Sequence, residues 1–347
     1  MAYQSIYKGT EIDRRLTDVD NRIALPSPAY AGLFPMATAQ GLVQWVPRGQ
    51  PTDAQTAAAI SAWLAAHPEA TTTVQDGAVT TAKIADGAVT MAKLAGGTYN
   101  GVDLTAAHAA EIGTQDPWAW IRSRIQAANY SGIHVGDYIP FTAGGNTYHA
   151  QVAGIDTYWR YGTPAVGHHI DFICDKLWSE SHKYNETATN NGTESAKSPW
   201  LASDLCGWLN STVFDALPLA LQAVIVPKLL DTETRYSASG GLTSSAGSAW
   251  VELGNLWLPT EVEVYGFPLT GTPYYSALGS IGKYPLFDIA VNRVKSTAAS
   301  TAKRVWWLLN ATDGSDKGIA CVNQYGAGAS ASANNTGMYA PICFRIA

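Results

Sequence analysis

Near the N-terminus, large aliphatic residues recur with the spacing of a coiled-coil seam, separated by four, three and four positions. They are Ile12, Leu16, Val19 and Ile23. Thr10 is a suitable N-cap for this predicted helix, and Pro26 would end it. Because so short a helix is unstable alone, we expect residues 1–30 to pair with copies of the chain, as a trimer or a dimer. An amphipathic helix that docks on its own chain is the alternative.

The next amphipathic pattern lies in residues 31–73. An alanine-rich segment begins at Thr52, which has capping-box spacing to Gln55, and it ends before Pro68. Its apolar positions are Ile60, Trp63 and Leu64. This pattern predicts a short helix with one buried face, so we interpret residues 31–73 as a small connecting region.

Residues 74–97 contain a ten-residue repeat, in which VQDGAVTTAK is followed by IADGAVTMAK. The large apolar residues are Val74, Val79, Ile84, Val89 and Leu94. Their spacing of five fits neither a continuous strand nor an α-helix, but it fits short extended pieces broken by Asp-Gly turns. Such a ribbon has too little apolar surface to bury alone, so we expect identical neighbouring chains to stabilise it as a β stalk. A flexible linker is the alternative.

A helical neck is predicted over residues 98–132, since Asp116 followed by Pro117 is a favourable helix start. Its buried face would hold Trp118, Ile121 and Ile125. From residue 133 onward the chain has short, aromatic-rich runs separated by glycine. Strands are predicted at 137–141, 147–152, 256–265 and 305–309, and helical segments at 205–226. We therefore expect an α+β domain over residues 133–347.

Composition excludes several classes of partner. The net charge of −6 provides no electrostatic footprint for nucleic acid. No apolar run is long enough to span a membrane, so no membrane insertion is expected. The first residues lack the apolar run of a signal peptide, and we expect none. Twelve tryptophans among 347 residues argue against a disordered chain.

Four cysteines are present, at positions 174, 206, 321 and 343. None belongs to a C-x-x-C pair, which disfavours a zinc site, and all lie among apolar residues. Buried free thiols are therefore predicted. A bond between Cys321 and Cys343 stays open, because it depends on whether the C-terminal strands are neighbours.

No combination of residues predicts catalysis. Adjacent His168 and His169 would point to opposite sides of a strand, which favours polar or core contacts over metal binding. Glu261 and Glu263 would share one strand face at a separation that suits a glycosidase, although solvated surface charge is the favoured interpretation. Nucleophile-elbow, P-loop and dinucleotide motifs do not occur. We predict no catalytic residue, no metal and no cofactor.

Binding is the more probable use of the C-terminal region on physical grounds. Seven aromatic residues are candidates for stacking on sugar rings, although most tryptophans are expected in the core; the seven are Tyr158, Trp159, Tyr161, Trp306, Trp307, Tyr325 and Tyr339. Val305–Leu309 and Ile342–Ile346 supply apolar strands, and polar side chains between them would be exchangeable without touching the core. These predicted binding residues are Asn310, Thr312, Asp313, Ser315, Asp316, Asn323, Gln324, Tyr325, Asn334 and Asn335. The alternative is that Gly326–Gly337 is a flexible loop that binds no ligand.

Two N-terminal stretches resemble the stalks of phage and prophage tail fibres. They are YKGTEID at 7–13 and WLAAHPEATTTVQDGAV at 63–79, which runs into the ten-residue repeats. Several C-terminal motifs resemble a phage-associated C-type lectin-like domain: HHIDF at 168–172, WLN at 208–210, VFDALP at 213–218, LWLPTEVE at 256–263, WWL at 306–308 and YAPICF at 339–344. The resemblance implies a trimeric helix and β-ribbon stalk followed by a C-type lectin-like (formylglycine-generating-enzyme-like) domain.

Proteins of this type include the variable proteins of diversity-generating retroelements. The resemblance places the ligand face at about Asn310–Tyr339, between the Trp-Trp strand and the closing strand. The family more often has Arg-Ser after Trp-Trp, where this chain has Leu308-Leu309-Asn310, a departure that fits both diversification and drift.

The resemblance implies a homotrimeric receptor-binding protein of the virion tail tip, produced in the cytoplasm of the bacterial host. Its N-terminus would attach to tail or baseplate proteins, and its C-terminal face would bind a host cell-surface glycan or protein. A glycan-degrading tail spike and a purely structural fibre subunit are the alternatives.

Overall fold

The structure is a computed structural model that describes residues 33–37, 43–47, 58, 61–63, 65, 101–162, 164–271 and 282–347. The chain forms two compact units, Met1–Lys93 and Leu94–Ala347. In the first unit, β1 (Leu33–Ala37) pairs antiparallel with β2 (Val43–Pro47), a hairpin that the sequence patterns did not predict. The helix expected after Thr52 is confirmed at residues 58, 61–63 and 65.

The residues proposed for trimerisation lie outside the described part of the chain. This applies to Ile12, Leu16, Val19 and Ile23 of the predicted coiled coil, and to Val74, Val79, Ile84, Val89 and Leu94 of the ten-residue repeats. The coiled coil and the β stalk therefore stay predictions.

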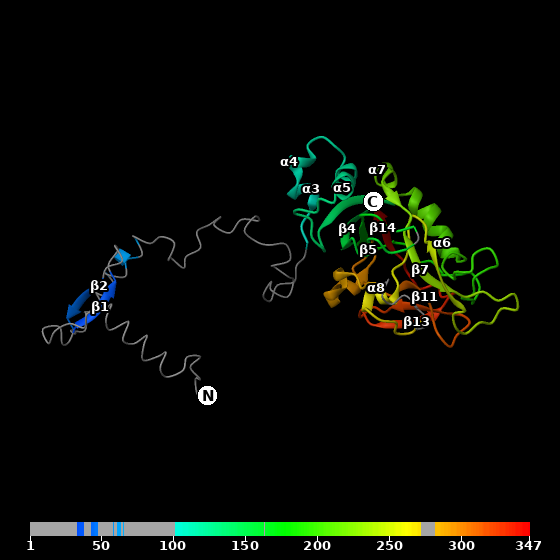
Figure 1. Cartoon of the computed structure of the whole chain (residues 1–347). Helices are drawn as coiled ribbons and strands as arrows, with labels where there is room; N and C mark the ends of the chain where they lie inside the picture. The colour runs from blue at the N-terminus through cyan, green and yellow to red at the C-terminus, as the bar shows by residue number, and fades with distance from the viewer. Residues whose placement is uncertain are drawn as a thin grey trace, which may run out of the picture. The chain divides into compact units, whose positions relative to one another are not determined.

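The second unit has an α+β fold built on a curled antiparallel sheet with the strand order β3-β4-β5-β14-β6 (Figure 1). Its strands are β3 (Tyr138–Ala143), β4 (Asn146–Ile155), β5 (Ile170–Leu177), β14 (Pro341–Ile346) and β6 (Ile225–Val226). The strands predicted near 137–141 and 147–152 are confirmed. Because β14 lies between β5 and β6, the last strand of the chain is enclosed by earlier ones, and all six of its residues are buried.

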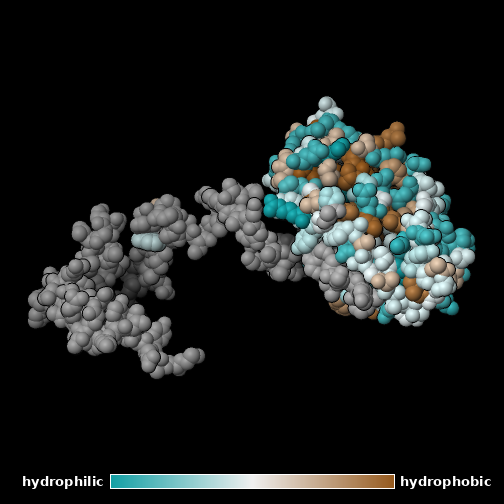
Figure 2. All heavy atoms as spheres, turned by 45° about the vertical axis from the view of Figure 1, so that its right-hand side comes forward, coloured by the Kyte–Doolittle hydropathy of each residue, from teal (hydrophilic) through white to brown (hydrophobic). Residues whose placement is uncertain are grey.

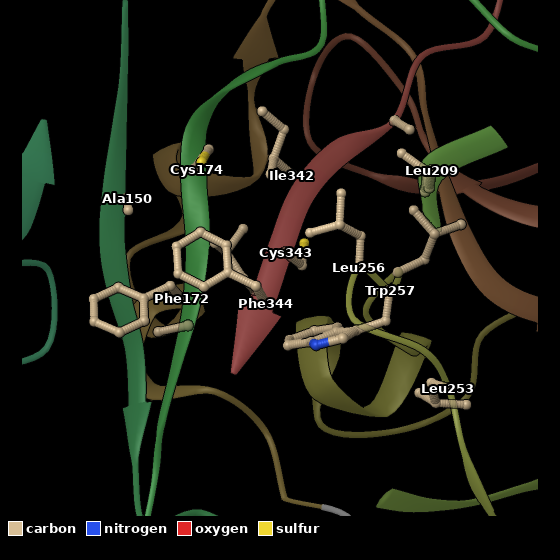
Figure 3. Packing of buried hydrophobic residues seen from close by; sticks show 14 of the residues in the cluster. Ala150, Phe172, Cys174, Leu209, Leu253, Leu256, Trp257, Ile342, Cys343 and Phe344 are labelled. Carbon is tan, nitrogen blue, oxygen red and sulfur yellow. The ribbon is translucent and has the colours of Figure 1, made fainter. Parts of the chain in front are cut away.

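Aromatic residues fill the core around this central strand. Phe172 of β5 and Phe344 of β14 lie side by side (Figure 3), and their rings stack with centroids 5.3 Å apart. Trp118 meets both rings edge-on, at 6.3 and 5.9 Å. Burial of these large side chains is the main source of stability here, at about 1.5–3 kcal/mol each.

Trp118 belongs to α5 (Pro117–Gln126), which begins as predicted: the Asp116 side chain accepts a hydrogen bond from Trp118 N, with Pro117 at the first helical position. The predicted buried residues Ile121 and Ile125 are fully covered. Two short helices, α3 (Leu104–Ala107) and α4 (Ala109–Ile112), precede it. The helices of the predicted neck thus belong to the same compact unit as the C-terminal strands.

The helical segments predicted at 205–226 are confirmed as far as Gln222, as α6 (Asp204–Trp208), the π-helical turn η5 (Leu209–Val213) and α7 (Leu219–Gln222). The end of the predicted range is wrong, because Ile225–Val226 form strand β6. Their apolar residues recur every four positions and are all buried: Leu205, Leu209, Val213 and Leu217. None of the helices in the described ranges is long and apolar enough to cross a membrane.

A second, three-stranded antiparallel sheet carries the candidate binding region. It has the order β11 (Trp306–Ala311), β12 (Gly318–Val322) and β13 (Gly328–Ser332), which confirms the strand expected at 305–309. Two strand pairs accompany it: β7 (Leu229–Thr234) with β8 (Gly247–Glu252), and β9 (Lys295–Ser296) with β10 (Lys303–Arg304). The short 3-10 helices η6 (Pro285–Asp288) and η7 (Ala290–Arg293) lie before β9 in the chain.

The strand predicted at 256–265 is wrong. Residues Glu261–Tyr265 form a helix, α8, that begins with a capping box. The Thr260 side chain accepts from Glu263 N, while the Glu263 carboxylate accepts from Thr260 N at 2.7 Å. The alternation of valine and glutamate imitates a strand, but Thr-x-x-Glu satisfies two backbone groups that only a helix start leaves open.

All four cysteines are buried and free, as predicted. Burial raises the pKa of Cys206 and that of Cys321, each to about 12. Because the thiolate is the reactive form, these side chains behave as small apolar residues of the core.

A buried ionic network crosses the core beside β14. The Asp171 carboxylate accepts from Arg345 Nε at 2.7 Å and Nη2 at 2.8 Å, and from the Tyr284 hydroxyl at 2.7 Å. Lys228 donates to Tyr284 at 2.8 Å and to Glu263, and its ammonium lies 3.8 Å from the centre of the Trp257 ring. Each of these charges has an opposite partner, which is the condition for keeping it inside a protein.

We expect Asp171→Asn to destabilise the protein by about 3–5 kcal/mol, because Arg345 would stay buried without its counterion. Burial would raise the pKa of Asp171, but the charges of Arg345 and Lys228 outweigh it and hold this pKa well below its ordinary value. The pair therefore stabilises the fold above the unfolded pKa of about 3.9 and this contribution is lost as the pH falls below it.

Urea unfolding of both proteins between pH 3 and 7 measures this effect. The free-energy gap between wild type and Asp171→Asn should narrow as the solution becomes acidic. Glu186→Gln, which alters an exposed carboxylate, is the control and should change stability little. An Asp171→Asn protein as stable as wild type at pH 7 would contradict the proposed role of the pair.

Candidate functional site

The structure sorts the seven candidate aromatics into core and surface. Tyr158, Trp306 and Trp307 are fully buried, and Tyr339 is half-buried. Trp159, Tyr161 and Tyr325 are exposed, and Tyr325 is the most open of them, with 79% of its surface accessible. On the face drawn in Figure 2, hydrophobic residues surface in small groups among polar ones.

Tyr325 stands on a closed turn between β12 and β13. The Asn323 side-chain oxygen accepts from Tyr325 N at 2.9 Å and from Ala327 N at 3.1 Å. Backbone bonds from Asn323 N to Ala327 O, at 2.8 Å, and from Gly326 N to Asn323 O, at 3.0 Å, complete the turn. The backbone below the exposed ring is thus fixed by hydrogen bonds.

Neighbouring segments of the chain pack against this turn. Gly326 has a φ of +81° and approaches so closely that a Cβ atom there would lie 3.0 Å from Val294 Cγ2. Its carbonyl accepts from the Tyr265 hydroxyl at 3.2 Å. At Gly328 an added Cβ would meet Leu269 at 2.3 Å. A larger side chain at Gly326 would therefore strain the backbone and crowd Val294, whereas at Gly328 the exposed Leu269 side chain would have to move aside.

The segments that contact this turn expose apolar side chains of their own. Phe267 is 56% exposed and Leu269 44% exposed, on the chain that follows α8. Val291 of η7 is 60% exposed, and it adjoins Ala290, whose carbonyl faces Gly326. We call Tyr325 and these exposed apolar side chains of the segments that contact its turn the apolar rim. Sequence reasoning had treated this region as polar.

The ten predicted binding residues do not form one surface. Thr312, Asp313, Ser315 and Asp316 lie on the turn between β11 and β12, and Asn323, Gln324 and Tyr325 lie at the opposite end of β12. Asn334 and Asn335 follow β13 and join the first group, because Gly318 pairs with Ser332 and Ala333 N donates to Lys317 O. The two groups are separated by the length of β12, roughly 14 Å at about 3.4 Å per residue.

Asn310 differs from the other nine because its side chain is fully buried. Its oxygen accepts from Glu261 N at 2.8 Å, at the start of α8. The expectation that this position changes without touching the core is therefore corrected: Asn310 belongs to the scaffold, where an unsatisfied helix N–H requires an acceptor.

The turn between β11 and β12 is held by two residues that sequence reasoning missed. Asn190 is buried and its amide donates to Ser315 O and Gly318 O, both at 2.8 Å. The buried Arg235 guanidinium donates twice to Thr312 O, at 3.1 Å. Neither contact has a local sequence signal, since the partners lie far apart in the chain.

Both glutamates of the pair considered for catalysis are fully buried, so the favoured interpretation as solvated surface charge is wrong. Glu261 accepts from the backbone N–H groups of Leu269, Thr270 and Gly271 at 3.1, 2.9 and 2.7 Å. Glu263 accepts from Lys228 and from the Tyr158 hydroxyl. Their oxygens are occupied by structural hydrogen bonds rather than open to a substrate.

The two adjacent histidines have different surroundings. His169 is fully buried, and its Nε2 accepts from Tyr158 N at 3.2 Å. His168 is half-exposed, with Nδ1 2.7 Å from Asp156 Oδ2. Within the described ranges, no three His, Cys, Asp or Glu side chains are grouped so as to hold a metal ion.

Residues 172–346, just over half of the chain, match the model of a family described as a domain of unknown function (DUF6273). The chain belongs to the DUF6273 family. No curated protein matches it, and no solved structure does. The DUF6273 region runs from β5 to β14, so it contains both ends of the three-stranded sheet and all ten predicted residues.

The buried carboxylate of Glu233 supports β11, the strand that leads into the turn between β11 and β12. Glu233 accepts from Ala311 N at 2.7 Å and from the Ser245 hydroxyl, and burial raises its pKa. A raised folded pKa means that the native state holds the proton more tightly than the unfolded chain. Stability contributed by Glu233 is therefore present below the unfolded pKa of about 4.3 and is lost as the pH rises above it.

We predict that Glu233→Gln removes this loss of stability at rising pH, because the amide oxygen still accepts from Ala311 N and the amide carries no charge. Guanidinium unfolding between pH 4 and 8 should give a flatter stability profile for Glu233→Gln than for wild type. Glu252→Gln, at an exposed site, serves as the matched control and should follow the wild-type profile. Parallel stability profiles for wild type and Glu233→Gln would contradict the raised pKa assigned to Glu233.

Proposed function

We propose that this chain is a receptor-binding protein of a phage or prophage tail, whose C-terminal unit recognises the surface of a bacterial host. The observation that carries the proposal is Tyr325, a large aromatic side chain that is 79% exposed on a turn fixed on several sides. Rigid aromatic side chains are efficient anchors, because they supply contact area while losing few rotamers.

The surroundings of Tyr325 suit the same role. Exposed apolar residues (Phe267, Leu269 and Val291) and the polar side chains of Asn323 and Gln324 give the mixed surface that binding sites use for anchoring and orientation. The Tyr325 side chain projects from the turn without holding it, so it is replaceable without loss of the scaffold. The Asn323 side chain is not, because its oxygen accepts two of the hydrogen bonds that close the turn.

For the architecture, residues 133–347 are proposed to be a C-type lectin-like domain of the formylglycine-generating-enzyme-like type. The sequence motifs listed above support this assignment. The Trp-Trp strand and the closing segment also lie together, since Trp307 N donates to Tyr339 O at 2.9 Å. In this proposal the exposed turns are the face that a diversity-generating retroelement would rewrite.

The N-terminal part is proposed to be the stalk, with the seam in residues 1–30 and the repeats in residues 74–97 joining identical chains. A trimer attached to tail or baseplate proteins at the virion tail tip would present three binding units together. Weak individual contacts would then give strong adsorption through avidity.

The oligomeric state of the full chain tests the stalk. We expect mass photometry and sedimentation at micromolar concentration to give a single species of three chains. A variant with Leu16→Asp and Val19→Asp should fall apart, because charges at the seam prevent its burial. A wild-type protein that sediments only as a monomer would contradict the trimeric stalk.

Replacing Tyr325 with alanine tests the binding face. Truncating a central aromatic anchor costs about 2 kcal/mol or more, which corresponds to about 30-fold weaker binding. Fluorescently labelled full-length protein should bind at least one strain in a panel of bacteria, and Tyr325→Ala should bind that strain about 30-fold more weakly.

Leu219→Ala is the control, because Leu219 is 81% exposed on α7, and it should bind like wild type. Equal binding by Tyr325→Ala and wild type would favour a purely structural fibre subunit. Absence of binding to every strain would count against receptor recognition as a whole, and release of reducing ends from surface glycans would indicate the enzymatic alternative.

A further inference from the structure

The loop between β4 and β5 carries two exposed aromatic residues outside the face proposed for receptor binding. Trp159 and Tyr161 are 37% and 44% exposed. The loop precedes residue 172, so it also lies outside the DUF6273 match.

The backbone of this loop adopts an unusual conformation. Asp156 has a φ of +51° and Arg160 a φ of +66°, values that glycine adopts readily and side-chain-bearing residues rarely do. Asparagine and aspartate tolerate this region, but an arginine gains nothing from it locally. Strained positions of this kind concentrate at ligand sites, where the surrounding structure enforces them.

Asp156 supplies that enforcement. Its Oδ1 accepts from His169 N at 2.8 Å and from the Tyr130 hydroxyl at 2.9 Å, while Oδ2 lies 2.7 Å from His168 Nδ1. Farther along the loop, Arg160 N donates to Val166 O at 2.8 Å. The loop is thus held at its base by a carboxylate and across its middle by the backbone.

This arrangement brings both His168 and Arg160 against the Trp159 ring. The His168 ring lies nearly parallel to Trp159, with centroids 5.0 Å apart and planes inclined by 18°. The Arg160 guanidinium carbon lies 4.0 Å from the centre of the Trp159 ring. Stacking on the indole orients the guanidinium plane before any ligand arrives.

The Arg160 guanidinium has no hydrogen bond or ion pair with any residue that the structure describes, and it lies over the Trp159 ring. A planar guanidinium with free N–H groups matches a carboxylate in a bidentate fashion. Because the Trp159 ring is taken up by His168 and Arg160, the apolar face left for the C–H face of a sugar is that of Tyr161, which follows Arg160 in the chain and is 44% exposed. The two features together select a ring that carries a carboxylate.

We infer that Trp159, Arg160 and Tyr161 form a second binding site, which takes an acidic sugar with its carboxylate on Arg160, oriented by Trp159, and its ring against the exposed Tyr161. His168 is a positioning residue, since it connects Trp159 to Asp156. The site does not depend on the proposed function of the Tyr325 turn, and it is expected to work when that turn is altered.

Ligand-observed NMR on the full-length protein tests the site with three probes: methyl glucuronide, methyl glucoside and glucose 1-phosphate. Methyl glucuronide should bind at least tenfold more tightly than the other two. Arg160→Gln should weaken glucuronide binding at least tenfold while leaving the thermal midpoint within a few degrees, and Trp159→Ala should abolish it. Tyr325→Ala is the matched control and should bind glucuronide like wild type.

Four results would overturn the inference: no glucuronide binding by wild type, equal binding of glucuronide and glucoside, tighter binding of the phosphate, or full binding by Arg160→Gln. Arg160→Gly is a second test variant, because glycine adopts the observed φ without strain. It should be at least as heat-stable as wild type and yet fail to bind glucuronide. A marked loss of stability in Arg160→Gly would show that Arg160 serves the fold instead.

Discussion

The position of β14 depends on charges that have no access to water. Asp171 and Arg345 are register partners on β5 and β14 and share two hydrogen bonds of 2.7 and 2.8 Å. Tyr284 and Lys228 extend this pair to Glu263 of α8. A buried charge without its partner is strongly destabilising. Arrangements of these segments that bury the charged residues apart from one another are therefore disfavoured. Apolar packing makes the core stable, and the ionic network restricts how its parts meet.

From this network, contacts lead outward to the candidate binding face. Glu263 fixes the first turn of α8, and in the same turn Glu261 accepts three backbone N–H groups from the chain that follows the helix. Asn310 joins that turn to β11. The exposed turns at both ends of β12 therefore rest on buried polar contacts as well as on apolar ones. Such support keeps loops in place when their outward side chains are exchanged.

Local patterns predicted the local structure well. Asp116-Pro117 marked the start of α5, and the leucines and valine spaced by four marked the helices after residue 204. At residues 260–265 two local signals conflicted: alternating valines suggested a strand, while Thr260 and Glu263 formed a readable capping box that prevailed. Asp171 and Arg345, 174 positions apart, could not have been paired from one sequence, because their meeting depends on β14 entering the sheet. The burial of Asn310 could not be predicted either, because its contact with Glu261 also joins segments that are distant in the sequence.

The separation of the candidate residues constrains what a receptor can be. Asn323 to Tyr325 and the group around Asp313 lie at opposite ends of β12, roughly 14 Å apart at about 3.4 Å per residue. One sugar ring is too small to touch both. A ligand that uses both ends must be a glycan chain or a protein surface, whereas a ligand of one sugar must choose the apolar rim of Tyr325 or the polar turns at the other end. Between these two ends, the apolar rim offers the larger gain on desolvation, so uncharged small ligands should favour Tyr325, whereas an acidic sugar has the separate site at Arg160.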